Sequence, residues 1–205
     1  MANQRKTTSE ELPLPAQLFE ALEPEIVTAG LHLRTAKRFS EALNIDRPDG
    51  IAWVMIVSLD AHYHSALFCL MRLFDPTRRR ALSLSRLIQA CKARLHELNP
   101  SVAARVEIDL DTLASELQRI GPLIRRLRNQ RNKLLAHLDP ASLLPELRAA
   151  LAAERLNLSE AEKVLLQAAR VYTLLYRSWA DCDLNLLEVI GEEEFDEAIK
   201  RLTTE

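Results

Sequence analysis

Between Pro122 and Pro140 the apolar residues recur at the spacing of one helix face, and this pattern predicts a helix there. At ~100° per residue, six apolar side chains fall on one side: Leu123, Ile124, Leu127, Leu134, Leu135 and Leu138. The rest of the chain has the same bias, because it has only 4 Gly, is 48% hydrophobic with many Leu and Ala, and shows little β-branched alternation. We therefore predict an all-α fold, a helical bundle of about five to seven helices.

Arg131 lies near the centre of this apolar face. A guanidinium does not lose its proton, and burying a charge without a partner costs several kcal/mol. A helix that served only for packing would carry Leu at this position. We therefore expect either that the apolar face meets a polar partner or that Arg131 faces a functional cleft.

Positive charge is concentrated on the same helix. The formal net charge of the chain is −2, yet no acidic residue lies between Glu116 and Asp139, where the basic residues are Arg119, Arg125, Arg126, Arg128, Arg131 and Lys133. A local cationic strip in a slightly acidic protein favours a phosphate-bearing ligand at one place. For Arg125, Arg126 and Arg128 a solvated helix face is the alternative.

His137 is expected in the last turn of this helix, because Pro140 disfavours helical dihedral angles at Asp139. The negative end of the helix dipole and the Asp139 carboxylate both favour the imidazolium, so we expect a raised pKa for His137. Such a histidine can give or take a proton near neutral pH. A simple C-terminal cap is the alternative.

Arg131 and His137 are about 120° apart around a helix, so one chain supplies only half of a compact site. A second copy of the helix, antiparallel across a two-fold axis, would bring the Arg and His of both protomers around one cleft. We therefore predict a homodimer in which the motif helices face each other across a two-fold axis.

The segment Arg131-Asn132-x4-His137 resembles the R-x(4–6)-H motif of the HEPN superfamily, the higher eukaryotes and prokaryotes nucleotide-binding domain. Within that superfamily the chain looks like the abortive-infection AbiU-type group. Residues 70–76 with Ser83 and Leu84, and residues 131–133 with 136–139, resemble two segments of that group. The resemblance spans roughly residues 25 to 190.

This resemblance implies a HEPN-like helical bundle, a two-fold dimer and a metal-independent endoribonuclease, with RNA as the substrate. Its catalytic residues would be Arg131, Asn132 and His137. The histidine would handle the 2′-hydroxyl or 5′-oxygen proton, and the arginine would stabilise the charge on the phosphorane. Asn132 would orient the histidine or bind a phosphate oxygen.

Further roles are expected for residues of the basic strip and for residues near the site. Arg125, Arg128 and Lys133 would bind RNA, and four residues would support the site: Asp139, Asp60, His64 and Asp75. No metal and no other cofactor are expected. An abortive-infection or toxin component would add an antitoxin or regulatory protein as a partner and antiviral defence as the process. In many toxins of the superfamily a tyrosine lies two residues after the histidine, and a nucleotidyltransferase silences the toxin by modifying this tyrosine. In this chain Asp139 occupies that position, so the resemblance does not imply this kind of silencing.

A second class of function remains open. A non-catalytic HEPN-like module could bind nucleotide or RNA, or assemble with another protein. In that case Arg131 would bond across an interface and His137 would only cap its helix. An unrelated helical regulator is a third interpretation.

Other residues with reactive chemistry have structural explanations. Cys69, Cys91 and Cys182 are odd in number and lack a CxxC pair, so we predict neither a disulfide framework nor a zinc site and expect buried thiols. Asp60 and His64, at i and i+4, predict a structural hydrogen bond, with a metal pair or a place in the cleft as alternatives.

The N-terminal end of the chain is polar and the C-terminal end is acidic, and these ends set the predicted limits of the domain. We predict a flexible segment over residues 1–12, one HEPN-like helical domain over 13–190, and an acidic helix or tail over 191–205. The apolar run at 51–59 is too short to cross a bilayer and is followed by polar residues, so we expect no membrane span. A cytoplasmic protein is predicted.

Helix boundaries are predicted from capping residues and breakers. The expected helices cover residues 23–43, 51 to just before Asp75, 83–97, 101–120 and 159–189. Ser83 and Ser101 are the expected N-caps, and Ser159 with Glu162 is the expected capping box.

Overall fold

The computed structural model describes residues 14–43, 49–74, 82–136 and 155–180, and these residues form helices without any strand. The helices are α1 (Pro15–Ala42), α2 (Asp49–Leu73), α3 (Leu84–Ala93), the 3-10 turn η1 (Leu95–Glu97), α4 (Pro100–Arg119), α5 (Gly121–Ala136) and α7 (Leu158–Ala180). The predicted all-α bundle is therefore confirmed.

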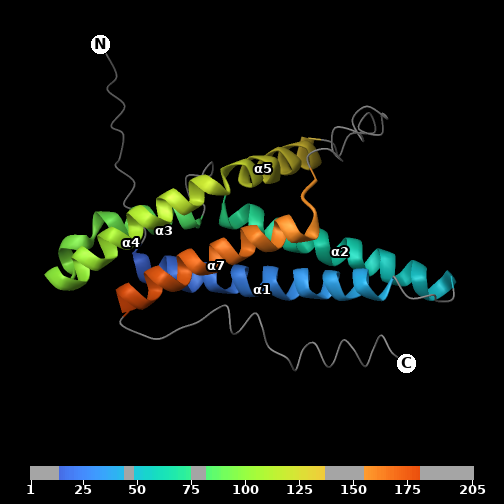
Figure 1. Ribbon diagram of the computed structural model, residues 1–205, viewed down its shortest axis with the longest axis horizontal. Helices are drawn as coiled ribbons and strands as arrows, with labels where there is room; N and C mark the ends of the chain where they lie inside the picture. The colour runs from blue at the N-terminus through green and yellow to red at the C-terminus, as the bar shows by residue number, and fades with distance from the viewer. Residues whose placement is uncertain (1–13, 44–48, 75–81, 137–154, 181–205) are drawn as a thin grey trace, which may run out of the picture.

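The helices form an elongated bundle (Figure 1). Helices α1 and α2 run antiparallel along its length, and α7 packs against α1 and α4. Helix α5 continues beyond the end of α4 and lies along the other side of α2. Each element of the core contributes fully buried apolar side chains, among them Leu22, Leu70, Leu87, Leu110 and Tyr172. Burial of each such side chain contributes about 1.5–3 kcal/mol.

Helix α1 begins at Pro15, about two turns before the predicted start at Glu23, and Pro24 lies inside it. The early start has a clear cause, because Leu18, Phe19 and Leu22 are all buried in the core. The Phe19 ring also makes an edge contact with the Tyr172 ring, with centroids 5.3 Å apart. Together these side chains outweigh the roughly 3 kcal/mol that a proline costs within a helix.

Two of the predicted caps are wrong and a third is only partly right. Ser83 precedes α3 as predicted, but its hydroxyl makes no capping bond. Helix α4 is capped by Asn99, whose side chain accepts a bond from the Ser101 N–H, because Pro100 occupies the first helical position. Helix α7 begins at Leu158, one residue before Ser159.

The capping box of α7 pairs Asn157 with Glu160 in place of Ser159 with Glu162. The Asn157 side chain accepts from the Glu160 N–H at 2.8 Å, and the Glu160 carboxylate accepts from the Asn157 N–H at 2.9 Å. Glu162 instead forms an exposed ion pair with Lys37.

Helix α2 over Gly50–Leu73 is long and apolar enough to cross a membrane by length and composition alone. Within the bundle it is the partner of α1 and buries Met55, Tyr63 and Leu67. Core helices of soluble proteins share this composition, so the expectation that no segment spans a membrane remains a prediction.

Candidate functional site

Helix α5 carries the first part of the sequence motif. Its backbone is helical through Ala136, so Arg131, Asn132 and Lys133 all belong to its last turns. His137, Asp139 and Asp75 lie outside the described residues. The helix was predicted to continue to about Leu138, and the described part agrees with this to its end.

The predicted apolar face of α5 is the buried face in its first half. Leu127 is fully buried and Ile124 nearly so. At 3.6 residues per turn, the backbone position of Arg131 is within about 20° of that of Ile124. The motif arginine is therefore placed on the continuation of the face that packs against the bundle.

Gln130 is a buried polar residue of α5 that the sequence analysis missed. It is 3% exposed, and its Oε1 has no hydrogen-bond partner in the part of the chain that the structure describes. A buried amide without partners is unfavourable. The buried side of α5 therefore already carries a polar residue one position before the motif.

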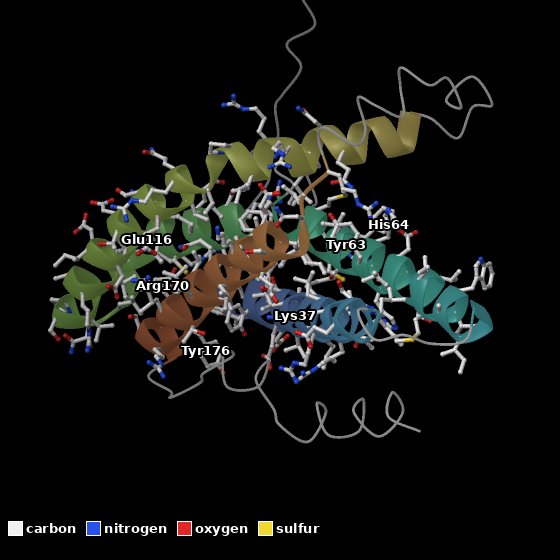
Figure 2. The ribbon with its side chains drawn as sticks, turned by 45° about the vertical axis from the view of Figure 1, so that its right-hand side comes forward. Lys37, Tyr63, His64, Glu116, Arg170 and Tyr176 are labelled. Atoms are coloured by element: carbon white, nitrogen blue, oxygen red, sulfur yellow. The ribbon has the colours of Figure 1, made fainter. Side chains whose placement is uncertain are left out.

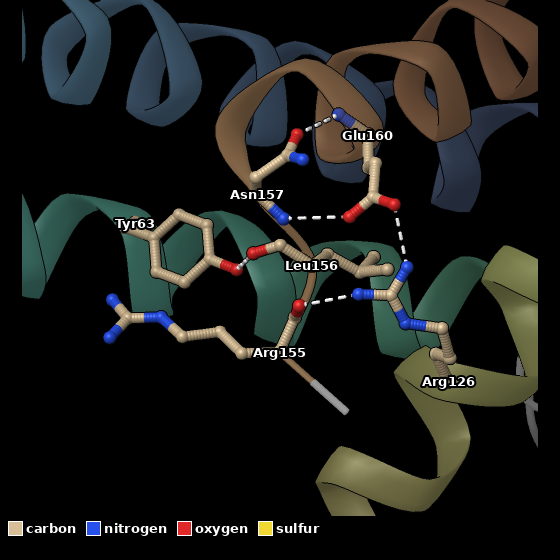
Figure 3. Close-up of polar contacts among 6 residues, drawn as sticks. All are labelled: Tyr63, Arg126, Arg155, Leu156, Asn157 and Glu160. Atoms are coloured by element: carbon tan, nitrogen blue, oxygen red, sulfur yellow. Dashed lines mark hydrogen bonds and ion pairs between the residues drawn. The ribbon is translucent and has the colours of Figure 1, made fainter. Parts of the chain in front are cut away.

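Arg126 joins α5 to the start of α7 (Figure 3). One guanidinium nitrogen lies 2.6 Å from Glu160 Oε1, and the other donates at 2.6 Å to the carbonyl oxygen of Arg155. The bond from Arg126, and next the backbone bond from Asn157, lower the pKa of Glu160. Arg126 is therefore a structural residue of the α5–α7 contact, and the solvated-face interpretation does not describe it.

Arg128 joins α5 to the end of α2. Its Nη2 donates at 3.0 Å to the carbonyl oxygen of Phe74, the residue that follows α2. A guanidinium at a helix C-terminus satisfies a free carbonyl and complements the helix dipole. Arg125, in contrast, is exposed. Of the two predicted RNA-binding arginines with described side chains, Arg125 is thus the more accessible.

Asp60 and His64 form the predicted structural contact on α2. The His64 Nδ1 lies 3.2 Å from Asp60 Oδ2 and 2.9 Å from the Asp60 carbonyl oxygen. Asp60 also accepts a bond from Arg155 Nη2 at 3.3 Å. The Arg155 guanidinium lies over the ring of Tyr63, 4.7 Å from its centroid.

Tyr63 completes this contact between α2 and the segment before α7 (Figures 2 and 3). Its buried hydroxyl donates to the carbonyl oxygen of Leu156. Burial raises the pKa of Tyr63, and the bond to Arg155 partly opposes this. The sequence analysis missed Tyr63 and Arg155, because their contacts join segments more than ninety residues apart.

The described site residues are thus connected through bridging residues. Asp60 and His64 lie on α2, and Asp60 binds Arg155. The Arg155 carbonyl in turn accepts a bond from Arg126 of α5. A continuous polar chain therefore links α2 to the helix that carries Arg131.

A second histidine contact lies between α1 and α2. The Nδ1 atoms of His32 and His62 are 2.8 Å apart, and the His62 ring stacks on Phe39 with centroids 6.1 Å apart. Burial and then the neighbouring His32 lower the pKa of His62. Among the described residues no group of three or more potential metal ligands comes together.

The buried positions of Cys69 and Cys91 confirm the prediction for these two thiols. Burial raises the pKa of Cys91 to about 12, so this thiol is not a nucleophile at neutral pH. Cys182 lies outside the described residues.

A helical bundle that carries an Arg-Asn-x4-His motif at the end of one helix has the features of a HEPN domain. The family comparison agrees, because the HEPN_AbiU2 family, described as AbiU2, matches residues 16–198. The chain therefore belongs to the AbiU2 family, the abortive-infection type of HEPN domain. No curated protein and no solved structure matches it.

Proposed function

We propose that this protein is a metal-independent endoribonuclease of HEPN type and acts as an abortive-infection or toxin component. Membership of the AbiU2 family is the observation that carries the proposal. The arrangement of α5 supports it, because Arg131 and Asn132 lie in the last turns of a helix that Arg126 and Arg128 hold against α7 and α2. His137 is the next residue in the sequence after Ala136, where the described part of that helix ends.

In the proposed reaction the 2′-oxygen of a ribose loses its proton and attacks the adjacent phosphorus, and the leaving 5′-oxygen gains a proton. His137 carries out one of these two proton transfers, and solvent water carries out the other. Arg131 stabilises the negative charge of the phosphorane, and Asn132 orients the histidine or a phosphate oxygen. The bond from phosphorus to the 5′-oxygen breaks. The products are a 2′,3′-cyclic phosphate and a 5′-hydroxyl, and the balance needs no metal or other cofactor.

RNA would lie along the basic side of α5, with Arg125 and Lys133 as phosphate contacts. Each chain supplies one Arg131 and one His137 at different angles around the helix, so the proposed active form is a homodimer. An antitoxin or regulatory protein would hold the enzyme silent, and the cytoplasm would be its place of action.

The experiment is cleavage of mixed cellular RNA by the purified full-length protein in chelator, with analysis of the product ends. Arg131→Ala and His137→Ala should each lower the rate at least ~100-fold. His96→Ala changes an exposed histidine in η1 and is the matched control that should cleave normally. Circular dichroism verifies that every variant keeps its helices.

Undiminished cleavage by His137→Ala or Arg131→Ala would refute the assignment of the site. Loss of wild-type cleavage in chelator would contradict metal independence and redirect attention to Asp60 and His64. Products with 3′-hydroxyl ends would contradict attack by the 2′-oxygen.

One observation favours a second candidate function, a non-catalytic module that binds nucleotide or RNA or assembles with another protein. Arg126 and Arg128 are engaged in contacts within the bundle, so part of the basic strip is used for packing. A folded dimer that binds RNA fragments and cleaves none would support this candidate.

A further inference from the structure

The first half of α2 exposes large apolar side chains to solvent. Ile51 is 50% exposed, Trp53 66%, Val54 58%, Ile56 52% and Val57 45%, and Phe68, further along the helix, is 46% exposed. Single exposed hydrophobic residues are ordinary on protein surfaces, but a continuous apolar row along one helix marks a contact surface. The opposite side of α2 packs against α1, so this row is not part of the core.

The row has the spacing of a two-helix interface. Val54, Val57, Ala61, His64 and Phe68 follow one another at alternating intervals of 3 and 4 residues, and we call this row the α2 seam. Such a repeat keeps side chains on one line of contact with a second helix. The seam spans about 21 Å at 1.5 Å per residue, or four turns.

The α2 seam lies beside the motif helix. His64 belongs to the seam and contacts Asp60, Asp60 binds Arg155, and the Arg155 carbonyl accepts from Arg126 of α5. Figure 2 shows Tyr63 and His64 on the side of α2 away from Lys37 of α1. A helix docked on the seam would therefore lie next to the contacts that hold α5.

We propose that the α2 seam binds the same seam of a second copy of this chain, antiparallel across a two-fold axis near Ala61. The proposal rests on the proposed function, because it assigns the face through which the half-sites of two chains come together. The small Ala61 side chain allows the two helix backbones to approach at the axis. Val54 of each copy then faces Phe68 of the other, so a small residue meets a large one, as a self-complementary two-fold contact requires.

The size of the seam indicates that the interface extends further. The exposed parts of the five seam side chains offer about 300 Å² per chain, whereas a stable complex buries ~800 Å² per partner. The surface next to the seam leads towards Arg155 and α5. The proposed interface therefore also includes the surface around Arg155 and Arg126, on the side of α2 that faces α5.

The charge of α2 argues against a lipid surface as the occupant. Helices that lie on membranes carry Lys and Arg on their polar face. Arg72, in the last turn, is the one basic residue of α2, and Asp60 borders the seam. A second apolar helix fits this surface better than an anionic headgroup layer does.

The first test measures the mass of the full-length protein at micromolar concentration by analytical ultracentrifugation. The wild type should have twice the 23.3 kDa of one chain. A Val54→Glu and Val57→Glu double variant should be monomeric, with a dimer dissociation constant raised at least ~100-fold. Ile108→Glu introduces the same charge at a 68% exposed apolar residue of α4 and should leave the dimer intact.

A monomeric wild type would overturn the proposal, and so would a double variant that still forms dimers or an Ile108→Glu control that loses them equally. Flotation with anionic vesicles tests the lipid alternative. Capture of a monomeric wild type but not of the double variant would mean that the seam binds lipid and would also refute it.

A cross-link tests the position of the axis. On a Cys182→Ser background, Ala61→Cys should form a disulfide-linked dimer under mild oxidation, because residues at a two-fold axis approach within disulfide range. Ala104→Cys, at an exposed position of α4, is the control and should remain reduced. Equal cross-linking of the two variants would contradict a pairing centred near Ala61.

The ribonuclease assay separates this proposal from the proposed function. Cleavage by the monomeric double variant would refute the role of the seam and leave the ribonuclease assignment intact. A seam-dependent dimer that never cleaves RNA would refute the ribonuclease assignment and leave the interface intact. A His137→Ala variant that forms dimers but does not cleave RNA, together with a double variant that is monomeric and inactive, would support both proposals.

Discussion

The contact of Arg126 with Glu160 should contribute measurably to the stability of the bundle. Both side chains are partly buried, with 31% and 23% of their surface exposed, so water screens the pair less than it screens a surface ion pair. Arg126 makes two bonds of 2.6 Å, and hydrogen bonds to charged groups contribute ~1.5–3 kcal/mol each when buried. Allowing for the remaining exposure, Arg126→Met should lower the free energy of unfolding by about 2 kcal/mol.

A double-mutant cycle with Glu160→Gln isolates the charge pair. Glutamine still accepts a bond from the Asn157 N–H, so the capping box survives the change. From urea unfolding at neutral pH we expect a coupling energy of about 1–2 kcal/mol between Arg126 and Glu160.

The exposed pair of Lys37 and Glu162, at 3.2 Å, is the control cycle and should show no more than ~0.5 kcal/mol. The folded-state pKa of Glu160 is lowered, so its contribution is present above the ordinary glutamate pKa and disappears as the pH falls through the lowered value. A coupling energy no larger than that of the control pair would refute this reasoning.

Three further expectations concern residues of the bundle, each measured by urea unfolding followed by circular dichroism. Ser83→Ala should leave stability unchanged or raise it by up to ~1 kcal/mol, because the buried Ser83 hydroxyl has no partner among the described residues; a loss of stability would show that it does cap α3. Asn99→Ala should cost ~1 kcal/mol, because the Asn99 side chain caps α4, and an unchanged midpoint would contradict that role. Burial and then the neighbouring His32 lower the pKa of His62 in the folded state, so stability should be full above the unfolded value of about 6.5 and should decrease as the pH falls from there towards the lowered pKa. His62→Asn should flatten this dependence, and an unaltered slope would exclude His62 as its source.

Sequence patterns were sufficient for the fold class and for most helices, because both depend on local periodicity and on breakers. Their limits appear at α1, which was predicted to start at Glu23 and starts at Pro15 instead. The start at Pro15 depends on the burial of Leu18 and on the contact of Phe19 with Tyr172, which is more than 150 residues away. A residue contact of this range leaves no local signal.

The caps illustrate competition between equivalent local signals. Ser101 and Asn99 both favour an N-cap, and Pro100 decides for Asn99 because proline fits the first helical position. Asn157 with Glu160 and Ser159 with Glu162 have the same spacing. Glu160 of the first pair also accepts a bond from Arg126, which lies on another helix.

The candidate site was predictable as a motif but not as an arrangement. Arg131, Asn132 and His137 could be recognised from their order alone, and Asp60 with His64 from their spacing. The partners of Arg126 and Arg128 could not, since each lies on a different element of the chain. A run of basic residues has the same appearance whether it faces solvent, RNA or a helix end.

Arg128 shows how the two uses of such a charge can be separated. In the structure its guanidinium binds the Phe74 carbonyl, while Arg125 is exposed on the same helix. A basic side chain that contacts a phosphate releases counterions from the RNA. Its removal therefore reduces the slope of the logarithm of the RNA-binding constant against the logarithm of salt concentration by about one, whereas removal of a packing contact leaves that slope unchanged. Arg125→Ala should therefore reduce the slope, and Arg128→Ala should keep the slope but lower the unfolding midpoint. The opposite result would mean that Arg128 leaves Phe74 and moves to the RNA when the complex forms.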